Sequence, residues 1–258
     1  MRASTGWAAS AGFAVMVVAT VAHAAPAVAG GTAADELLGR PLALVVGLAL
    51  LSLLPFVFMS LTAFVKISTV LQIVRGAIGA QGVPSGTVVT ALAAALAVLA
   101  MTPTLGRIAD RLEPLLESRT TDSVALVRAG VDAVREPLRD FLRANASARE
   151  RERFAEVARR AAERRTGGAA GPAAGPDDLV VLGPAFLATE LREAFALGFA
   201  LYLPFLVIDL VVANVLLALG MQQLQPTQVS LPFKLLLFVA IDGWGLLAQA
   251  LVAGYQAG

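Results

Sequence analysis

The chain has 258 residues, 57% of them hydrophobic, and a mean hydropathy of +0.75. A soluble domain holds about 45–50% apolar residues, so the composition indicates an integral membrane protein. The formal net charge of +1 gives no case for a nucleic-acid partner. The chain has no cysteine, which excludes thiolate nucleophiles, disulfides and iron–sulfur clusters.

Residues 1–24 have the pattern of a secretory signal peptide. Arg2 supplies the positive charge, residues 8–21 form a short apolar core, and Ala22-His23-Ala24 is an A-x-A cleavage site. The alternative is an uncleaved first membrane helix, but the short core favours cleavage after Ala24. Cleavage would remove the single histidine, and with it histidine triads and histidine-based metal sites. We therefore predict no metal site and no cofactor.

The first half of the mature chain predicts one helical hairpin, residues 41–106, after a small-residue linker at 25–40. An apolar run from Pro41 to Val74 is longer than one bilayer needs, and Pro55 is expected to kink or break it. A glycine- and proline-containing loop follows Arg75. The second apolar helix is expected at residues 87–105, ended by Pro103.

A charged block separates the two apolar halves. Residues 107–165 hold 14 Arg and 11 Asp or Glu, which is 25 of the chain's 39 charges. An apolar stripe at helical spacing runs through Val131 and Phe141, and Pro137 is expected to start a new helix. A further helix is expected at 148–165, with a solvated charged face rather than a patch for anionic lipid or nucleic acid. A flexible linker is expected at 166–178.

The second hairpin, residues 179–258, carries three ionisable groups in very apolar helices. Residues 194–219 predict a membrane helix with Asp209, and a second helix from about Val229 carries Lys234 and Asp242. Such groups are costly in lipid and usually face protein or water. A polar turn at residues 220–228 joins the two helices.

The fold prediction is an all-α integral membrane protein with a cleavable signal peptide. Four long apolar helices form two hairpins, and the charged helical insert lies outside the membrane between them. With the mature N-terminus outside the cytoplasm, four spans place the C-terminus outside and the insert in the periplasm of a bacterium. The loop at Arg75 would then be cytoplasmic, in keeping with the positive-inside rule.

Three uses of the intramembrane charges stay open from the residues alone. Asp209 and Asp242 could form a protease dyad, although no Gly-x-Gly-Asp motif is present, and Ser230 with Lys234 could form a nucleophile and base. Lys66, Asp209 and Asp242 could form a transporter relay, but secondary transporters usually have more spans and an internal repeat. Structural pairing is the third reading, for example of Asp209 with Lys66 or with a neighbouring subunit. Small and polar residues on the last two helices suit close packing in an assembly.

Several segments together resemble the SctR/FliP family, the export-gate subunits of bacterial type III secretion systems in injectisomes and flagella. In the second half they are Leu203-Pro204-Phe205-Leu206-Val207-Ile208-Asp209-Leu210-Val211-Val212, Gly220-Met221, Ser230-Leu231-Pro232-Phe233-Lys234-Leu235 and Asp242-Gly243-Trp244. In the first half they are Ser52-Leu53-Leu54-Pro55, Phe64-Val65-Lys66-Ile67-Ser68, Leu71-Gln72-Ile73-Val74-Arg75 and Gln81-Gly82-Val83-Pro84. The likeness covers about residues 41–110 and 179–255.

The resemblance implies a non-enzymatic subunit of a homo-oligomeric, pentameric ring in the bacterial inner membrane. S and T subunits complete the ring, other export-apparatus proteins and lipids surround it, and unfolded protein substrates pass through it. In the family a methionine-rich turn closes the resting pore, which here corresponds to Met221, Gln222 and Gln223. Only the first of the three is methionine, so glutamines would close the ring by hydrogen bonding. Lys66, Asp209, Lys234 and Asp242 then become packing or assembly contacts.

Two features point to different branches of the family. Phe64-Val65-Lys66-Ile67-Ser68 and Gly220-Met221-Gln222 look more like the injectisome branch, whereas the signal peptide is more typical of the flagellar branch. We favour the injectisome branch and keep the flagellar one as the alternative.

Overall fold

The computed structural model describes residues 52–53, 55–80, 82–117, 123–165, 174–221 and 223–256. The predicted signal peptide with Ala22 and Ala24, the linker at 25–40, Gln222 and most of the linker at 166–178 lie outside these residues. The chain divides into two compact units, one of Met1–Phe58 and Gly106–Glu136 and one of Met59–Leu105 and Pro137–Gly258. The second unit carries the features that matter for function.

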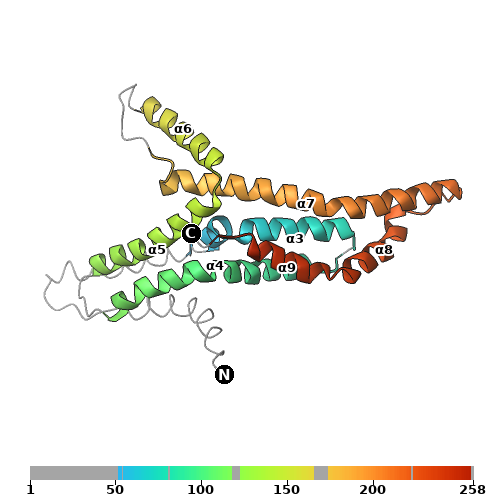
Figure 1. Ribbon diagram of the computed structural model, residues 1–258, viewed down its shortest axis with the longest axis horizontal. Coiled ribbons are helices and arrows are strands. Elements are labelled where there is room, and N and C mark those ends of the chain that lie inside the picture. The colour runs from blue at the N-terminus through green and yellow to red at the C-terminus, as the bar shows by residue number, and fades with distance from the viewer. Residues whose placement is uncertain are drawn as a thin grey trace. The chain divides into compact units, whose positions relative to one another are not determined.

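Every regular element in the described residues is a helix. A short helix, Pro55–Leu61, precedes the labelled ones. These are α3 (Phe64–Ile78), α4 (Gly86–Glu117), α5 (Ser123–Asn145), α6 (Ala148–Arg165), α7 (Leu179–Ala218), α8 (Pro226–Ala240) and α9 (Gly243–Ala253) (Figure 1). Two of the described helices, α4 and α7, are each long and apolar enough to cross a membrane. Two bent pairs raise the number of candidate spans to four if each pair forms one span.

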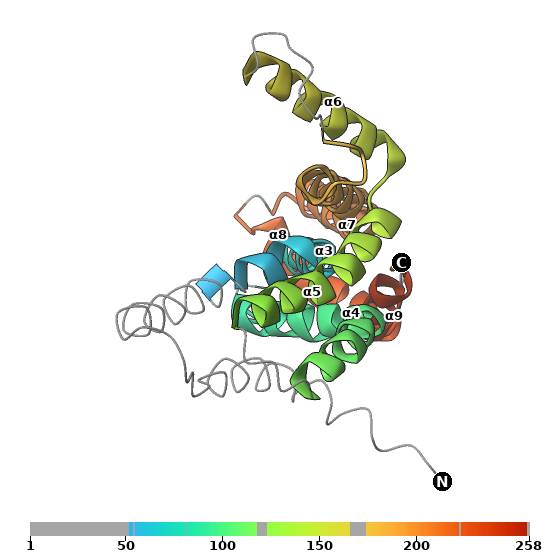
Figure 2. The same ribbon diagram turned by 90° about the vertical axis from the view of Figure 1, so that its left-hand side faces the viewer.

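The core of the second unit lies where α3 packs along α7, side by side in both views (Figures 1 and 2). Ile67, Val70, Leu71 and Val74 repeat at steps of three and four and are almost fully buried. Each such side chain contributes about 1.5–3 kcal/mol when removed from water. Gly198 of α7 permits the close approach, because a Cβ there would lie 2.4 Å from Cδ1 of Ile73.

Helix α7 is longer than a membrane requires. Its 40 residues span about 60 Å at 1.5 Å per residue, about twice the hydrocarbon core of a bilayer. Only 11% of its most apolar window is buried within the chain. Large apolar side chains such as Phe199, Leu210 and Leu217 are more than 60% exposed. The helix therefore offers far more apolar surface than the described residues cover.

The bend between α8 and α9 explains the Asp242-Gly243-Trp244 motif. The two helices meet at 58°, and Asp242 at the junction has φ +51°. A Cβ on Gly243 would lie 2.3 Å from the ring of Phe238, which also packs edge-on against Trp244 at 5.1 Å. A Cβ on Gly245 would lie 2.3 Å from the Asp242 carboxylate. Gly243 is therefore required by the close approach of the buried Phe238 ring, whereas the exposed Asp242 carboxylate can move to admit a Cβ on Gly245.

Several expected helix ends are wrong. Helix α4 continues past Pro103 to Glu117, and α5 continues through Pro137, so no new helix starts there. A proline deletes one N–H and crowds the preceding turn, but the helix-forming residues on either side keep both helices continuous. Of the expected apolar stripe, Phe141 is buried whereas Val131 is exposed.

Other breaks are present as well. The first apolar run bends by 74° at residues 62–63, and the helix before that bend begins at Pro55, where the sequence predicted a kink or break. The last helix is interrupted before Gly243. The predicted helix at 148–165 is confirmed with the same bounds.

Candidate functional site

Asp209, Ser230 and Lys234 form one buried polar cluster between α7 and α8. Lys234 Nζ lies 2.6 Å from Oδ2 of Asp209, and the Ser230 hydroxyl donates to Oδ1 at 2.5 Å. Lys234 Nζ also donates to the carbonyl of Ala77 at 3.1 Å, in the last turn of α3. Ser230 is fully buried, and the side chains of Lys234 and Asp209 are 4% and 22% exposed. The cluster therefore ties three helices together.

The spacing of Asp209, Ser230 and Lys234 in the sequence explains how their side chains meet. Ser230 and Lys234 are four residues apart, so they share one face of α8. Asp209 lies on the antiparallel partner helix α7, eleven residues before Gly220. The last carbonyls of a helix carry partial negative charge, so the end of α3 is a favourable place for an ammonium group.

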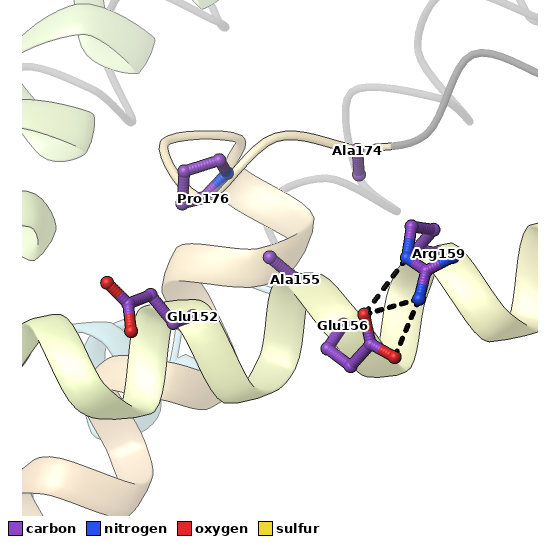
Figure 3. A pocket seen from close by; sticks show the side chains of 6 residues that line it. All are labelled: Glu152, Ala155, Glu156, Arg159, Ala174 and Pro176. Carbon is purple, nitrogen blue, oxygen red and sulfur yellow. Dashed lines mark hydrogen bonds and ion pairs between the residues drawn. The ribbon is translucent and has the colours of Figure 1, made fainter.

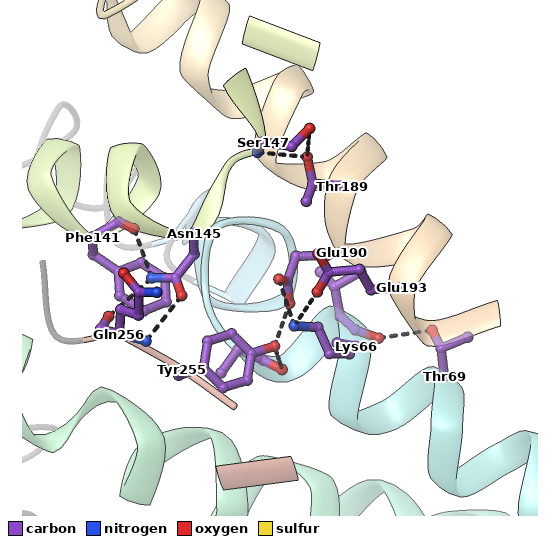
Figure 4. Close-up of polar contacts among 12 residues, drawn as sticks. Lys66, Thr69, Phe141, Asn145, Ser147, Thr189, Glu190, Glu193, Tyr255 and Gln256 are labelled. Carbon is purple, nitrogen blue, oxygen red and sulfur yellow. Dashed lines mark hydrogen bonds and ion pairs between the residues drawn. The ribbon is translucent and has the colours of Figure 1, made fainter. Parts of the chain in front are cut away.

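A second cluster joins α3 to the first half of α7 (Figure 4). Lys66 Nζ lies 3.1 Å from Oε1 of Glu190 and 2.8 Å from Oε2 of Glu193. The side chains of Lys66 and Glu190 are 8% and 1% exposed, whereas that of Glu193 is 45% exposed. Glu190 and Glu193 lie one helical turn apart, which turns both carboxylates toward one lysine.

The four charges singled out from the sequence thus separate. Asp209 pairs with Lys234, and not with Lys66 as the sequence suggested. Asp242 is exposed at the start of α9 and joins neither cluster. Glu190 and Glu193 were missed as partners because, from sequence, they marked only the edge of the apolar segment.

This arrangement fits neither of the two hydrolytic sites considered from the sequence, the aspartate dyad and the serine–lysine pair. Both carboxylate oxygens of Asp209 are occupied, by Lys234 and Ser230, and Asp242 is not brought to them. The Ser230 hydroxyl donates to Asp209 and not to Lys234, so the nucleophile and base geometry is not formed.

The turn between α7 and α8 has a defined backbone. Gly220 adopts φ +73°, and the N–H groups of Gly220 and Met221 return to the carbonyls of Leu217 and Leu216 at 3.0 and 2.9 Å. This is a Schellman ending, for which glycine is the usual residue. Met221 beyond it is 47% exposed, and Gln223 is exposed too. Met221 and Gln223 are therefore largely uncovered by the described part of the chain.

A shallow hollow of about 260 Å³ lies between α6 and residues 174–176 (Figure 3). Its charged residues Glu156 and Arg159 bind each other at 2.8 Å. The Arg159 and Arg160 guanidinium groups hold the pKa of Glu156 below its usual range. Glu156 and Arg159 therefore neutralise each other, which leaves Glu152 as the remaining charged residue of the lining. In the described part of the chain, no group of three or more His, Cys, Asp or Glu side chains could hold a metal ion.

Comparison with known proteins gives one consistent match. The model of the FliP family matches residues 47–251. The chain is 40% identical to the hypersensitivity response secretion protein HrcR of Ralstonia nicotianae, over 83% of this chain and 96% of the relative. It is 38% identical to the Yop proteins translocation protein R of Yersinia pestis, over 82% and 95%. It is 37% identical to the flagellar biosynthetic protein FliP of Caulobacter vibrioides, over 95% and 87%.

Proposed function

The chain belongs to the FliP family, and on this premise we propose that it is a pore-forming structural subunit of a bacterial type III export gate. It assembles as a homo-oligomeric ring, a pentamer, with small S and T subunits, and passes unfolded proteins across the inner membrane. The observation that carries the proposal is the family match over residues 47–251, supported by relatives named for secretion, translocation and flagellar biosynthesis. The subunit needs no cofactor and catalyses no reaction.

The unburied apolar length of α7 supports an assembly. A helix of about 60 Å cannot lie within a hydrocarbon core of about 30 Å unless it is strongly tilted or extends beyond it. Its exposed Phe199, Leu210 and Leu217 need lipid or protein around them. Neighbouring copies and the S and T subunits supply that cover, with other export-apparatus proteins and lipids at the periphery.

In the proposed topology the four candidate spans are all used. The mature N-terminus and the C-terminus are outside the cytoplasm, and the charged insert at 107–165 is periplasmic. The ion-pair network of α6 supports a solvated insert, because Arg159 binds Glu156 and Glu163 while Arg160 binds Glu156. The signal peptide at 1–24 directs the first translocation and is cleaved after Ala24.

Met221, Gln222 and Gln223 are proposed to close the resting pore. The Schellman ending of α7 projects Met221 into the surroundings, and a flexible thioether can seal against varied surfaces. Glutamines from neighbouring copies would complete the closure through amide hydrogen bonds.

The test is to replace Met221-Gln222-Gln223 with three small residues in the assembled complex. We expect ion conductance or efflux of small solutes from reconstituted vesicles to increase, because the closing side chains are gone. Gln228→Ala, exposed in the first turn of α8, is the matched control and should leave permeability unchanged. Equal permeability of the turn variant and the control would overturn the assignment of the gate.

Lys66, Asp209 and Lys234 are proposed to stabilise the subunit for assembly, and Asp242 to contact a neighbouring copy. The pairing of both lysines with carboxylates supports this role over a proton relay. We favour an injectisome over a flagellar system. The flagellar alternative keeps the same chemistry, and relatives of both kinds are similar to the chain.

A further inference from the structure

The C-terminal tail, residues 254–256, leaves α9 and meets three elements that are remote in sequence (Figure 4). The tail contacts Ala63 beside the start of α3, Asn145 at the end of α5, and Glu190 in α7. Chain ends usually fray unless side chains or backbone hydrogen bonds fix them. The number of specific contacts here therefore calls for an explanation.

The phenol of Tyr255 fits between charges. Its hydroxyl donates to Oε2 of Glu190, a residue with no exposed surface, and the carbonyl of Ala63 lies 3.2 Å away as a second acceptor. Lys66 Nζ lies 4.5 Å from the centre of the ring, within the range of a cation–π interaction. The buried carboxylate thus meets a lysine through one oxygen and a phenol through the other. A buried charge without such partners would be costly.

The backbone next to the phenol is held independently. The side-chain amide of Asn145 donates to the carbonyl of Gln256 at 3.0 Å and accepts its N–H at 3.1 Å. This two-point contact recognises an extended main chain as a neighbouring strand would. The Phe141 ring stacks on Tyr255 at 6.1 Å and 20°, which forms the apolar wall of the site.

We infer that residues 254–256 are a latch that docks, within its own chain, in a receptor site built by Lys66, Phe141, Asn145 and Glu190. The docked tail fastens the end of α9 to α3, α5 and α7. Since α9 continues from α8, the latch restrains the helix that carries Ser230 and Lys234. The inference concerns the chain itself and does not depend on the proposed export function.

Trimming by a carboxypeptidase tests whether the tail is docked. The enzyme must capture an undocked tail, so in the full-length chain in detergent we expect removal to stall before Gln256, as read by intact mass. Tyr255→Phe keeps the ring but deletes the hydroxyl. The loss of one hydrogen bond to a charged group should raise the trimming rate through residue 255 about 10- to 100-fold.

Matched variants distinguish the loss of tail docking from a general loss of stability. Tyr202→Phe changes the other tyrosine of the chain and should leave trimming unchanged. Asn145→Ala leaves the tail sequence intact and should also accelerate trimming, because it removes the grip on the main chain. Wild-type trimming that runs through Tyr255 as fast as in the Tyr255→Phe variant would overturn the latch.

A cross-link decides whose tail occupies the site. The chain has no cysteine, so Asn145→Cys with Gln256→Cys can be joined by a short thiol-reactive reagent without background. We expect the product to have the mass of one chain, and the two single-cysteine variants to give no such product. A product of two joined chains would show that the tail docks on a neighbouring copy, and no product would show that it does not dock; either overturns the inference.

Discussion

Replacing Asp209 should destabilise the subunit more than replacing its partner Lys234. Asp209→Asn leaves the Lys234 ammonium, 4% exposed, without its countercharge and with neutral acceptors alone, the Ala77 carbonyl and the new amide oxygen. Lys234→Met leaves the Asp209 carboxylate with the Ser230 hydroxyl and 22% of its surface exposed. Removal of one partner of a buried pair costs about 3–5 kcal/mol. Asp209→Asn should fall near the upper end of that range and Lys234→Met near the lower end.

The assay is thermal unfolding in detergent, followed by circular dichroism at the helix band. At about 2–4 °C per kcal/mol for a chain of this size, the midpoint should fall by about 10–20 °C for Asp209→Asn and about 6–12 °C for Lys234→Met. The double variant should lose less than the sum of the two, because no unpaired charge remains. Glu152→Gln alters an exposed carboxylate of α6 outside the cluster and serves as the control.

Two outcomes would refute this reasoning. If the single variants have the same unfolding midpoint as the control, the pair contributes nothing to the stability of the subunit. A double variant whose loss equals the sum of the singles would mean that the two groups act separately. Normal stability and normal ring recovery with secretion lost would instead indicate that Asp209 couples export to an energy source.

Two further predictions concern a close contact and a buried phenol. Gly198→Ala should destabilise the subunit by about 1–3 kcal/mol in the same unfolding assay, because the new methyl group overlaps Ile73, and Ile73→Val should restore part of the loss. Gly106→Ala is the control. A Cβ at Gly106 has no neighbour within 4 Å, so this variant should be neutral or slightly stabilising. Burial and the neighbouring Glu190 charge raise the pKa of Tyr255 in the folded chain. The phenol therefore contributes its full stabilisation below about pH 10. This stabilisation is lost as the pH rises above that value, because the phenol of the unfolded chain ionises first. The midpoint of the wild type should then fall faster than that of Tyr255→Phe in alkaline buffer, and parallel curves would contradict the assigned environment.

The sequence carries the positions of the intramembrane charges but not their pairing. Asp209 and Lys234 lie 25 residues apart across one turn, so their meeting follows from an antiparallel hairpin. Lys66 meets Glu190 only because α3 packs on α7 in one register, which is set by contacts such as that of Gly198 with Ile73. No local pattern encodes that register.

Proline misled the prediction of helix ends, and the contact of Tyr255 with Glu190 was not predicted from the sequence. Pro103 and Pro137 each lack one N–H, yet the surrounding helix-forming residues maintain α4 and α5. Tyr255 is an isolated aromatic residue after an apolar helix, and only the tertiary structure shows that its hydroxyl reaches Glu190. A polar aromatic residue at the end of an apolar helix was the one available signal, and it does not name a partner.

The most direct test of the central claim is the native mass of the assembled protein. The chain is co-expressed with candidate S and T subunits, extracted in mild detergent, and measured by native mass spectrometry after removal of the detergent. The proposal predicts one discrete complex that contains five copies of the chain together with both small subunits. A monomer that binds neither the S nor the T subunit would contradict the proposal.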